Sequence, residues 1–449
     1  MSLLGETLQA GVYSPQEFLR QRFARGNSLL SFARHIGTAG RQLARFTETL
    51  QSPVGTSRML ESKYGIPRVG RSGSTGSIHT VISPVPSTIT KIEYWPVDIP
   101  ITDPFVVATG ARTIAENVFL RVTLSNGAQG YGEAAPFPEV GGETRESCLL
   151  TLHELGKIVL GRSAKDYKEV GGLLSEQALA YPAARCGLET AVIDVYCHTA
   201  NIPMWQLWGG ADVRTRETDI TIPIADLDKT VALARGWYAK GFRLFKMKVG
   251  KDVESDIRRL EAVHHALPGI SFIGDGNQGF SRQDCLTFAQ GVKRFGGTMV
   301  LLEQPVVRDD LDSMAAIRRE TGIPVAADES VRSLADAQEV VARSAADYIN
   351  IKIMKTGVAE AVEIASFTKA SGLKLMIGGM VETRIAMGCS FSLVLGLGGF
   401  DVLDLDTPLL LASDPVTGGY RYEGSRLHPW SGPGLDMTAA HSQDITTIE

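Results

Sequence analysis

The sequence predicts an α/β protein built on a (β/α)8-type barrel, with a smaller domain before it and an N-terminal extension. The chain has 449 residues, which is too long for one small module and fits one large barrel with additions. Eight short apolar runs recur about every 25 residues in its second half. Segments of helical length, rich in Ala, Leu and charged residues, separate these runs, and strands that alternate with helices pair in parallel.

Residues 1–88 are predicted to be a basic extension and linker. Up to residue 87 there are ten Lys and Arg against four Glu and no Asp, whereas the remainder is acidic and brings the chain to a net charge of −5. Residues 68–87 are rich in Gly, Ser and Pro, which is typical of a linker. Arg-rich, acid-poor starts also occur in transit peptides, but the first 19 residues contain no Lys or Arg. We expect a cytoplasmic protein, with organellar targeting left open.

Strand-like alternation follows over residues 89–100 and 117–133, with a turn at residues 125–127, and residues 143–208 are mostly helical. Strands and helices thus mix in this part of the chain, before the regular pattern begins. The predicted domains are a smaller domain at 89–215, a barrel domain at 216–405 and a C-terminal segment at 406–449.

The eight apolar runs are predicted to be the barrel strands. They are apolar throughout, as expected for strands that are buried on both faces. Eight parallel strand–helix units close into a barrel. The runs lie at residues 218–224, 243–249, 271–275, 298–303, 323–328, 347–353, 373–379 and 400–405.

Five of the runs end in polar residues. The carboxyl ends of barrel strands form one rim, so residues over 100 positions apart converge there. The intervals from Lys248 to Asp275, Glu303, Asp328 and Lys352 are regular, at 27, 28, 25 and 24 residues. The polar strand ends are Lys246 and Lys248, Asp275 and Asn277, Glu303, Asp328 and Glu329, and Asn350 and Lys352.

Asp275, Glu303 and Asp328 predict a site for a divalent cation. Three carboxylates on neighbouring strand ends cannot all stay ionised without one, and an all-oxygen ligand set favours Mg²⁺ or Mn²⁺ over Zn²⁺. Such an ion would bind a substrate carboxylate and stabilise the enediolate that forms when the α-proton leaves.

Lys248 and Lys352 are predicted to be two bases on opposite sides of the mouth. A base needs a lowered pKa, and we expect the like charge of Lys246 and the nearby cation to lower it. Two bases on opposite faces of a planar enediolate are what a 1,1-proton transfer requires. One removes the proton, and the other returns it with inverted configuration.

Each element also has a structural explanation when it is taken alone. A Lys-x-Lys pair at a strand end is commonly solvated, and an Asp or Glu there commonly caps the next helix. Residues 274–279 match the dinucleotide fingerprint G-x-G-x-x-G, but Asp275 would lie beside the pyrophosphate and the strand period is a barrel's. Five polar strand ends in order favour a functional site.

Several common classes of protein are excluded by missing patterns. The five cysteines form no C-x-x-C pair, so neither a zinc site nor a disulfide framework is indicated. The sequence has no H-E-x-x-H pattern and no G-x-S-x-G elbow. No apolar run reaches the roughly 18–20 residues of a membrane span, and the net charge argues against a nucleic-acid partner.

Together the polar strand ends resemble those of the enolase superfamily, in its muconate-lactonizing-enzyme subgroup. The resemblance covers about residues 89–435. The mandelate-racemase subgroup instead has a His on strand seven, where this chain has Gly378, Gly379 and Met380. The motifs that carry it are Lys246-Met-Lys248, Asp275-Gly-Asn277, Glu303-Gln-Pro305, Asp328-Glu-Ser330, Asn350-Ile-Lys352-Ile-Met-Lys355 and Tyr131-Gly-Glu-Ala-Ala135.

The resemblance implies an enolase-like (β/α)7β barrel, over which both chain ends fold as an α+β capping domain. It implies that Asp275, Glu303 and Asp328 hold one Mg²⁺ per subunit. It also implies that Lys248 and Lys352 are the acid/base pair, with Lys246 as a supporting lysine.

Asp404 and Asp406, at the end of the eighth strand, are similar to the Asp-x-Asp of the dipeptide epimerases, among them L-Ala-D/L-Glu epimerase. In that family the two carboxylates hold the free α-ammonium of the dipeptide. The structural alternative is that one Asp caps a terminal turn. The candidate substrate-binding residues are Asp404, Asp406, Gly379, Val381, Asn277 and Lys355.

The side chain at the epimerised position is predicted to be small or apolar. Glutamate-specific members carry an Arg in the first mobile loop of the capping domain, where this chain has Gly110, with Arg112 two residues on. The strand-seven rim at Gly379 and Val381 offers no acid for a cationic side chain, although Glu382 is adjacent.

Two alternatives remain. One is an N-acylamino acid racemase, o-succinylbenzoate synthase or cycloisomerase of the same subgroup, but these substrates have no ammonium for Asp404 and Asp406. The other is a non-catalytic scaffold with a partner-binding extension, which the intact strand ends disfavour. We therefore expect a homo-oligomeric isomerase that acts on a small molecule, with neither a nucleic acid nor a membrane as partner.

Overall fold

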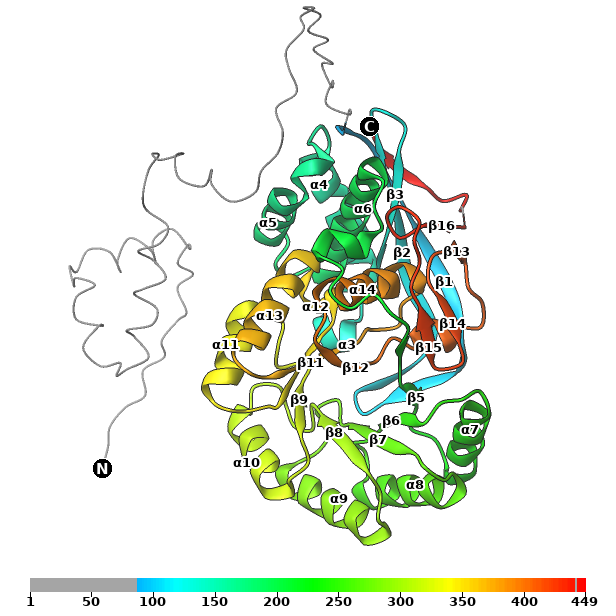
Figure 1. The fold of residues 1–449 in the computed structure, drawn as a ribbon, viewed down its shortest axis with the longest axis vertical. Coiled ribbons are helices and arrows are strands. Elements are labelled where there is room, and N and C mark those ends of the chain that lie inside the picture. The colour runs from blue at the N-terminus through cyan, green and yellow to red at the C-terminus, as the bar shows by residue number, and fades with distance from the viewer. Residues whose placement is uncertain (1–86, 441) are drawn as a thin grey trace, which may run out of the picture. The chain divides into compact units, whose positions relative to one another are not determined.

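The computed structural model describes residues 87–440 and 442–449, so the predicted extension lies outside the described residues except for its last two positions. All eight predicted barrel strands are present within the described range (Figure 1). They form one parallel sheet in the order β12-β11-β10-β9-β8-β7-β6-β5. The strands are β5 (Ile220–Ile222), β6 (Leu244–Lys248), β7 (Ser271–Asp275), β8 (Met299–Glu303), β9 (Val325–Ala327), β10 (Tyr348–Ile351), β11 (Lys374–Ile377) and β12 (Phe400–Leu403).

Helices separate consecutive barrel strands and cover the outside of the sheet (Figure 1). Most begin with a side-chain cap, such as Asp226, Asp252 and Ser281, whose oxygen accepts a hydrogen bond from a backbone N–H of the first turn. The last strand is followed by a short 3-10 turn, Thr407–Leu409, instead of a helix. The helices are α7 (Leu227–Ala239), α8 (Val253–Ala266), α9 (Arg282–Phe295), α10 (Leu311–Thr321), α11 (Leu334–Ala342), α12 (Ile353–Thr356), α13 (Val358–Ala370) and α14 (Arg384–Leu397).

The two edges of the sheet meet at a seam between β5 and β12. The backbone N–H of Asp219 donates to the carbonyl oxygen of Leu403 (3.0 Å), as in a strand ladder. Two residues further along the same strand, the backbone N–H of Thr221 donates to a side chain instead, to Oδ2 of Asp406 (2.6 Å). A carboxylate therefore takes the place of a strand carbonyl and helps to close the barrel.

The capping domain combines the start and the end of the described chain, as the resemblance implied. Its antiparallel sheet has the order β17-β1-β2-β3, so the last strand pairs with the first. Gly132 of β3 lies so close to α6 that a Cβ there would meet the carbonyl oxygen of Gly187 at 2.0 Å. The elements are β1 (Ile89–Val107), β2 (Gly110–Leu124), β3 (Gln129–Ala134), α3 (Pro138–Gly141), α4 (Arg145–Val159), α5 (Tyr167–Gln177), α6 (Pro182–Ala200) and β17 (Thr446–Ile448).

The C-terminal segment returns along the barrel to this cap in short strands. It forms two small sheets, β13-β16 and β14-β15-β4, before β17 joins β1. The strands are β4 (Arg216–Glu217), β13 (Val416–Gly418), β14 (Arg421–Glu423), β15 (Arg426–His428) and β16 (Met437–Ala439).

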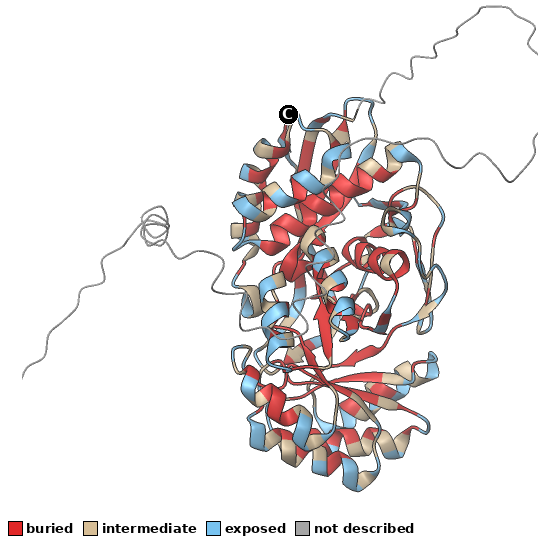
Figure 2. Ribbon diagram, turned by 60° about the vertical axis from the view of Figure 1, so that its left-hand side comes forward, coloured by how far each residue is buried: buried red, intermediate tan, exposed pale blue. Residues whose placement is uncertain are grey.

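Buried residues run through the barrel strands and through α6 and α14 (Figure 2). The long apolar helix α14 thus lies inside the molecule rather than on its surface. All five cysteines are buried and unpaired, as their spacing predicted. Among the described residues, no helix is both long and apolar enough to cross a membrane.

One tether fixes the cap to the barrel. Glu133, on β3, points its carboxylate at the first turn of α14. Its Oε1 accepts from the N–H of Thr383 and the amide of Asn117, both at 2.8 Å, and its Oε2 accepts from Oγ1 of Thr383 (2.7 Å) and the N–H of Ala386 (3.1 Å). A negative charge at a helix N-terminus is favourable, so this contact holds the cap at a defined place above the strand ends.

Candidate functional site

The polar strand ends form one continuous row at the barrel mouth. Lys248 of β6 pairs in register with Asp275 of β7, and Asp275 pairs with Glu303 of β8. Asp328 follows β9 directly, and Lys352 follows β10 directly. All five residues are at most 5% exposed. The rim predicted from the spacing of these residues is therefore present.

Lysines and carboxylates alternate along this row. Lys248 Nζ lies 2.6 Å from Oδ2 of Asp275, and Lys352 Nζ lies 2.6 Å from Oδ2 of Asp328. Lys246 lies two residues before Lys248 on the same strand, deeper in the barrel. Its ammonium contacts three carboxylates at 2.6–3.0 Å, those of Asp404, Glu303 and Asp275. Protein ammonium groups thus neutralise the carboxylates that we predict to hold a metal.

The charges of this cluster shift its acids in opposite directions. Burial opposes the ionisation of Asp275, but the ammonium groups of Lys246 and Lys248 outweigh it and hold the pKa of Asp275 well below its usual range. Burial, together with the charge of Asp275, raises the pKa of Glu303 to about 8. The three carboxylates therefore do not all carry a stable negative charge without a further cation.

The expected fall of the lysine pKa relied on a bound cation as well as on like charge, and the protein's own contacts act in the opposite direction. Burial does act to lower the pKa of Lys352 and of Lys246, but the neighbouring carboxylates outweigh it and raise both well above the usual value. The like charge of neighbouring lysines is thus outweighed, because each of these two lysines directly contacts an acid. The pKa of these lysines can fall only if something else neutralises the carboxylates.

Unsatisfied acceptors surround the mouth, which supports the predicted cation. Seven buried side-chain oxygens there have no hydrogen-bond donor, and all of them are carboxylate or amide oxygens. Buried polar atoms are almost always paired in proteins, so a cluster of unpaired acceptors calls for cations or donors from a ligand. The oxygens belong to Asp219 (both), Asn277, Glu329, Asn350, Glu382 and Asp406.

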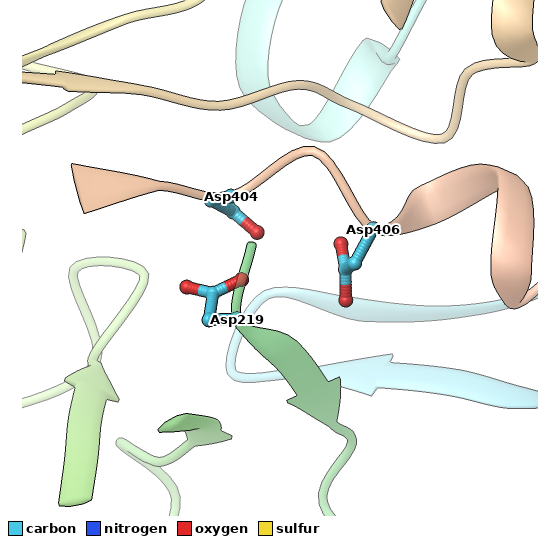
Figure 3. A group of neighbouring side chains, drawn as sticks. All are labelled: Asp219, Asp404 and Asp406. Carbon is cyan, nitrogen blue, oxygen red and sulfur yellow. The ribbon is translucent and has the colours of Figure 1, made fainter. Parts of the chain in front are cut away.

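Asp404 and Asp406, which the sequence placed together, form an acidic group with a third residue, Asp219 (Figure 3). One oxygen from each carboxylate lies within 4.8 Å of the other two, and all three residues are at most 4% exposed. Burial, together with the charge of Asp404, raises the pKa of Asp406 to about 7 and that of Asp219 well above its usual value. The group is thus poorly neutralised.

Sequence analysis missed Asp219 because it searched only the carboxyl ends of the strands. Asp219 precedes β5, and its side chain shares a face with that of Thr221, two residues on. An acid at the start of the first apolar run was the available clue. Asp406 stands at the N-cap position of the 3-10 turn Thr407–Leu409, but its side chain makes no capping hydrogen bond there and instead accepts from the N–H of Thr221 at the seam.

A small pocket of about 30 Å³ lies between the cap and the barrel mouth, and both Lys248 and Lys352 line it. Asn277 and Gly379 also line it, as predicted for substrate-binding residues. Apart from Thr109 and Glu329, the remaining wall is apolar and comes from the cap and from the loop after β11, at Phe105, Val107, Phe137, Val140 and Met380. Sequence analysis missed these residues, because cap loops have no periodicity that marks a pocket wall.

Two predicted substrate-binding residues face elsewhere. Val381 packs in a separate apolar cluster with Ile99 and Phe105, and its carbonyl oxygen accepts a hydrogen bond from Asn117 (2.9 Å). Lys355 directs its ammonium at Asp328 and at the carbonyl oxygen of Asn350, which occupies its three N–H donors. Lys355 thus holds Asp328 in place.

Arg112 does not point into the pocket as a substitute for a glutamate-binding Arg. Its Nη2 donates to Oε2 of Glu139 (2.7 Å), and its guanidinium lies 4.2 Å from the ring centre of Phe137. These contacts join the start of β2 to α3, the two cap segments above the mouth. Its charge is already neutralised, which leaves the pocket wall apolar.

Known families match this architecture over both domains. The model described as "Mandelate racemase / muconate lactonizing enzyme, N-terminal domain" matches residues 89–209, and the one described as "Enolase C-terminal domain-like" matches residues 229–441.

Individual relatives agree with the family models. The chain is 40% identical over 344 residues to an aromatic dipeptide epimerase of Herpetosiphon aurantiacus. The aligned region covers 76% of this chain and 96% of the relative. It is 38% identical over 343 residues to an L-Ala-D/L-amino acid epimerase of Populus trichocarpa, covering 75% and 81%. A solved dipeptide epimerase of Enterococcus faecalis, complexed with Mg and L-Leu-L-Tyr, is 29% identical with a TM-score of 0.75, covering 78% of this chain and 99% of that one.

Proposed function

This chain belongs to the enolase superfamily, in its mandelate racemase and muconate lactonizing enzyme subgroup, and we propose that it is a magnesium-dependent dipeptide epimerase that prefers an apolar side chain at the epimerised position. Dipeptide epimerases are similar to it over about three quarters of the chain. It is therefore an isomerase, of the class that racemises or epimerises amino acid derivatives.

The order of the strands is the observation that carries this proposal. Lys248 ends β6 and Lys352 follows β10, four strands away in a barrel of eight. Four steps around eight strands is half the circle, so the two lysines face one another across the mouth. A substrate α-carbon between them would present one face to each, as inversion requires.

The two arcs between the lysines supply different chemistry. Asp275, Glu303 and Asp328 come from β7, β8 and β9, which all lie on one arc. Asp404 and Asp406 follow β12, on the other arc. A dipeptide laid across the mouth would place its carboxylate at the first arc and its free ammonium at the second. The bond between Cα and its proton would then lie between the lysines.

Asp275, Glu303 and Asp328 fit Mg²⁺, because they are three buried carboxylates on adjacent strands and together supply an all-oxygen set of ligands. Bound there, the ion would neutralise the substrate carboxylate and the negative charge that develops on it as the proton leaves. Neutralising these acids would also weaken the ion pairs of Lys248 with Asp275 and of Lys352 with Asp328. Lys246 and Lys355 stay as fixed charges that position the acids.

The apolar wall indicates which side chain the enzyme accepts. Phe105, Val107 and Phe137 from the cap face the lysines, and the nearest guanidinium, that of Arg112, is paired with Glu139. Lys248 and Lys352 are already paired with Asp275 and Asp328, so an acidic side chain would lose its hydration here without gaining an unpaired cation. At about 30 Å³ the pocket holds little more than water, so entry of a dipeptide requires the two cap segments to separate.

A library of L,L-dipeptides incubated with the enzyme and Mg²⁺ in D₂O tests this function. We expect one deuteron to enter the C-terminal residue as the L,D-diastereomer forms, with Leu, Phe or Tyr preferred over Glu at that position. N-acetylated dipeptides serve as the control. A preference for the acetylated compounds would contradict the proposal and favour an N-acylamino acid racemase. The expected homo-oligomer and cytoplasmic location stay predictions.

A further inference from the structure

We propose that Asp219 is the third carboxylate of the substrate-ammonium pocket and so helps to select dipeptides with a free amino group. This inference rests on the proposed function, which places the ammonium at Asp404 and Asp406. Asp219 is fully buried, and neither of its carboxylate oxygens has a hydrogen-bond donor. Figure 3 shows its carboxylate turned toward that of Asp404.

The spacing of the group suits a primary ammonium. A nitrogen at the centre of three oxygens that lie 4.8 Å apart would be about 2.8 Å from each, within the range of an N–H···O bond, and three oxygens closer together can be reached at the same distance from above their plane. An α-ammonium has three N–H donors, and here three carboxylates converge. Lys246 already makes one such contact in this cluster, 2.6 Å from Asp404.

The free acceptors are distributed as this role requires. One oxygen of Asp406 is occupied by the N–H of Thr221, and the other has no donor. Asp404 uses Oδ2 for Lys246. Asp219 alone has both oxygens free, so it contributes most of the unsatisfied acceptor capacity. Left without a ligand, such a buried carboxylate is costly, which argues that a cationic group occupies the pocket during turnover.

The side chain of Asp219 is not needed for the barrel seam. The seam bond of this residue is made by its backbone N–H to Leu403. The adjacent Thr218 uses its side chain instead, accepting from the N–H of Leu405 (2.8 Å) and donating to the carbonyl oxygen of Leu403 (3.2 Å). Asp219→Asn therefore removes the charge and keeps the seam, whereas Thr218→Val weakens the seam and keeps the charge.

These two variants form a matched pair for the test. Initial rates are measured for wild type, Asp219→Asn and Thr218→Val on L-Leu-L-Phe and on its N-acetyl analogue. We expect Asp219→Asn to lower kcat/KM for the free dipeptide by about 10–100-fold, mainly through KM, as for the loss of a bond to a charged group. The acetylated compound should change less than twofold. Thr218→Val should affect both substrates equally.

Binding of the non-epimerisable dipeptide L-Leu-Gly, followed by calorimetry, gives a readout without turnover, and we expect the same 10–100-fold loss for Asp219→Asn. If Asp219→Asn does not fold, as judged by circular dichroism, Asp219→Ser removes the same charge. Equal losses on both substrates, or no loss, would overturn the role of Asp219. The role of Asp219 would also be overturned if wild type bound two Mg²⁺ per subunit and Asp219→Asn bound only one, because Asp219, Asp404 and Asp406 would then form a metal site. A wild type inactive on every dipeptide would instead overturn the proposed function itself.

Discussion

Buried acids in the capping domain and at the barrel mouth are arranged in opposite ways. In the cap, Glu143 accepts from the first N–H groups of α6 at 2.8 and 3.0 Å, and Asp194 accepts from two backbone N–H groups at 2.8 and 2.6 Å. At the mouth, Asp219, Asp404 and Asp406 face one another, and Asp275, Glu303 and Asp328 share four lysines.

This difference separates structural from functional acids. Both oxygens of a cap carboxylate have a donor within the protein, so the cap is complete without a ligand. At the mouth seven acceptor oxygens have none, so that region is complete only when cations and a substrate occupy it. Acids in the cap should therefore govern stability, and acids at the mouth should govern metal binding and turnover.

The largest effect is expected at the mouth, from Glu303→Gln. The substitution keeps the size of the side chain and removes one of three charges that we propose hold Mg²⁺. We expect kcat to fall by about 10³-fold or more and calorimetry to detect little Mg²⁺ binding. The melting temperature should change little, because Glu303 accepts hydrogen bonds only from Lys246 and Asn350. Full activity of this variant, or of wild type in EDTA, would contradict the account.

In the cap, Glu133→Gln should reverse that pattern. Glu133 accepts four hydrogen bonds, three of them from Thr383 and Ala386 at the start of α14. An amide nitrogen in place of one oxygen would leave buried donors facing each other, at a cost of about 2–4 kcal/mol. Thermal melts should detect this loss, while Mg²⁺ affinity of the folded variant stays near wild type. An unchanged melting temperature with reduced Mg²⁺ affinity would break the division between cap and mouth.

Where the cap meets the mouth, Glu139→Gln should change specificity rather than stability. Glu139 neutralises Arg112, and both are partly exposed. Releasing the guanidinium near the apolar pocket should raise kcat/KM for L-Ala-L-Glu by about 3–10-fold, since such partly exposed pairs are worth about 1 kcal/mol. L-Ala-L-Leu is the control and should not improve. A parallel rise for both dipeptides would instead indicate that the cap segments merely open more easily.

The smallest effect concerns pH and the ion pair of Glu93 with Arg121 in the cap. Burial opposes ionisation of Glu93, but the Arg121 guanidinium outweighs it and lowers the pKa of Glu93. A lowered carboxyl pKa contributes stability that is present above the unfolded pKa of about 4.3 and is lost as the pH falls through the folded value. Glu93→Gln should therefore cost about 0.5 kcal/mol at pH 7 and nothing near pH 3. A constant difference across this range would show that the pair contributes through packing.

The sequence predicted the framework of this molecule because the framework is periodic. All eight apolar runs contain a barrel strand, and the five polar strand ends converge because parallel register aligns them. Residues outside that period were missed. Asp219 precedes its strand, and Phe105 and Phe137 reach the pocket from cap segments whose sequence gives no sign of what they face.

Electrostatics was the other feature beyond the reach of the sequence. A Lys-x-Lys pair indicates two like charges, but the structure places each lysine against an acid, and these contacts raise the pKa of Lys246 and Lys352. The direction of a pKa shift depends on distances of a few ångströms between charged groups. The spacing of residues along the chain does not determine these distances. The predicted division into domains and the role of residues 1–88 stay predictions.

The central claim is that Lys248 and Lys352 serve opposite faces of one substrate α-carbon, and hydrogen exchange in D₂O tests it most directly. Lys248→Ala and Lys352→Ala are each incubated with the L,L and the L,D form of one dipeptide, and deuterium at the C-terminal residue is measured by mass spectrometry. We predict that neither variant interconverts the forms, that each exchanges the proton of only one form, and that the two variants choose opposite forms. Exchange of both forms by either variant, or of the same form by both, would contradict the two-base account.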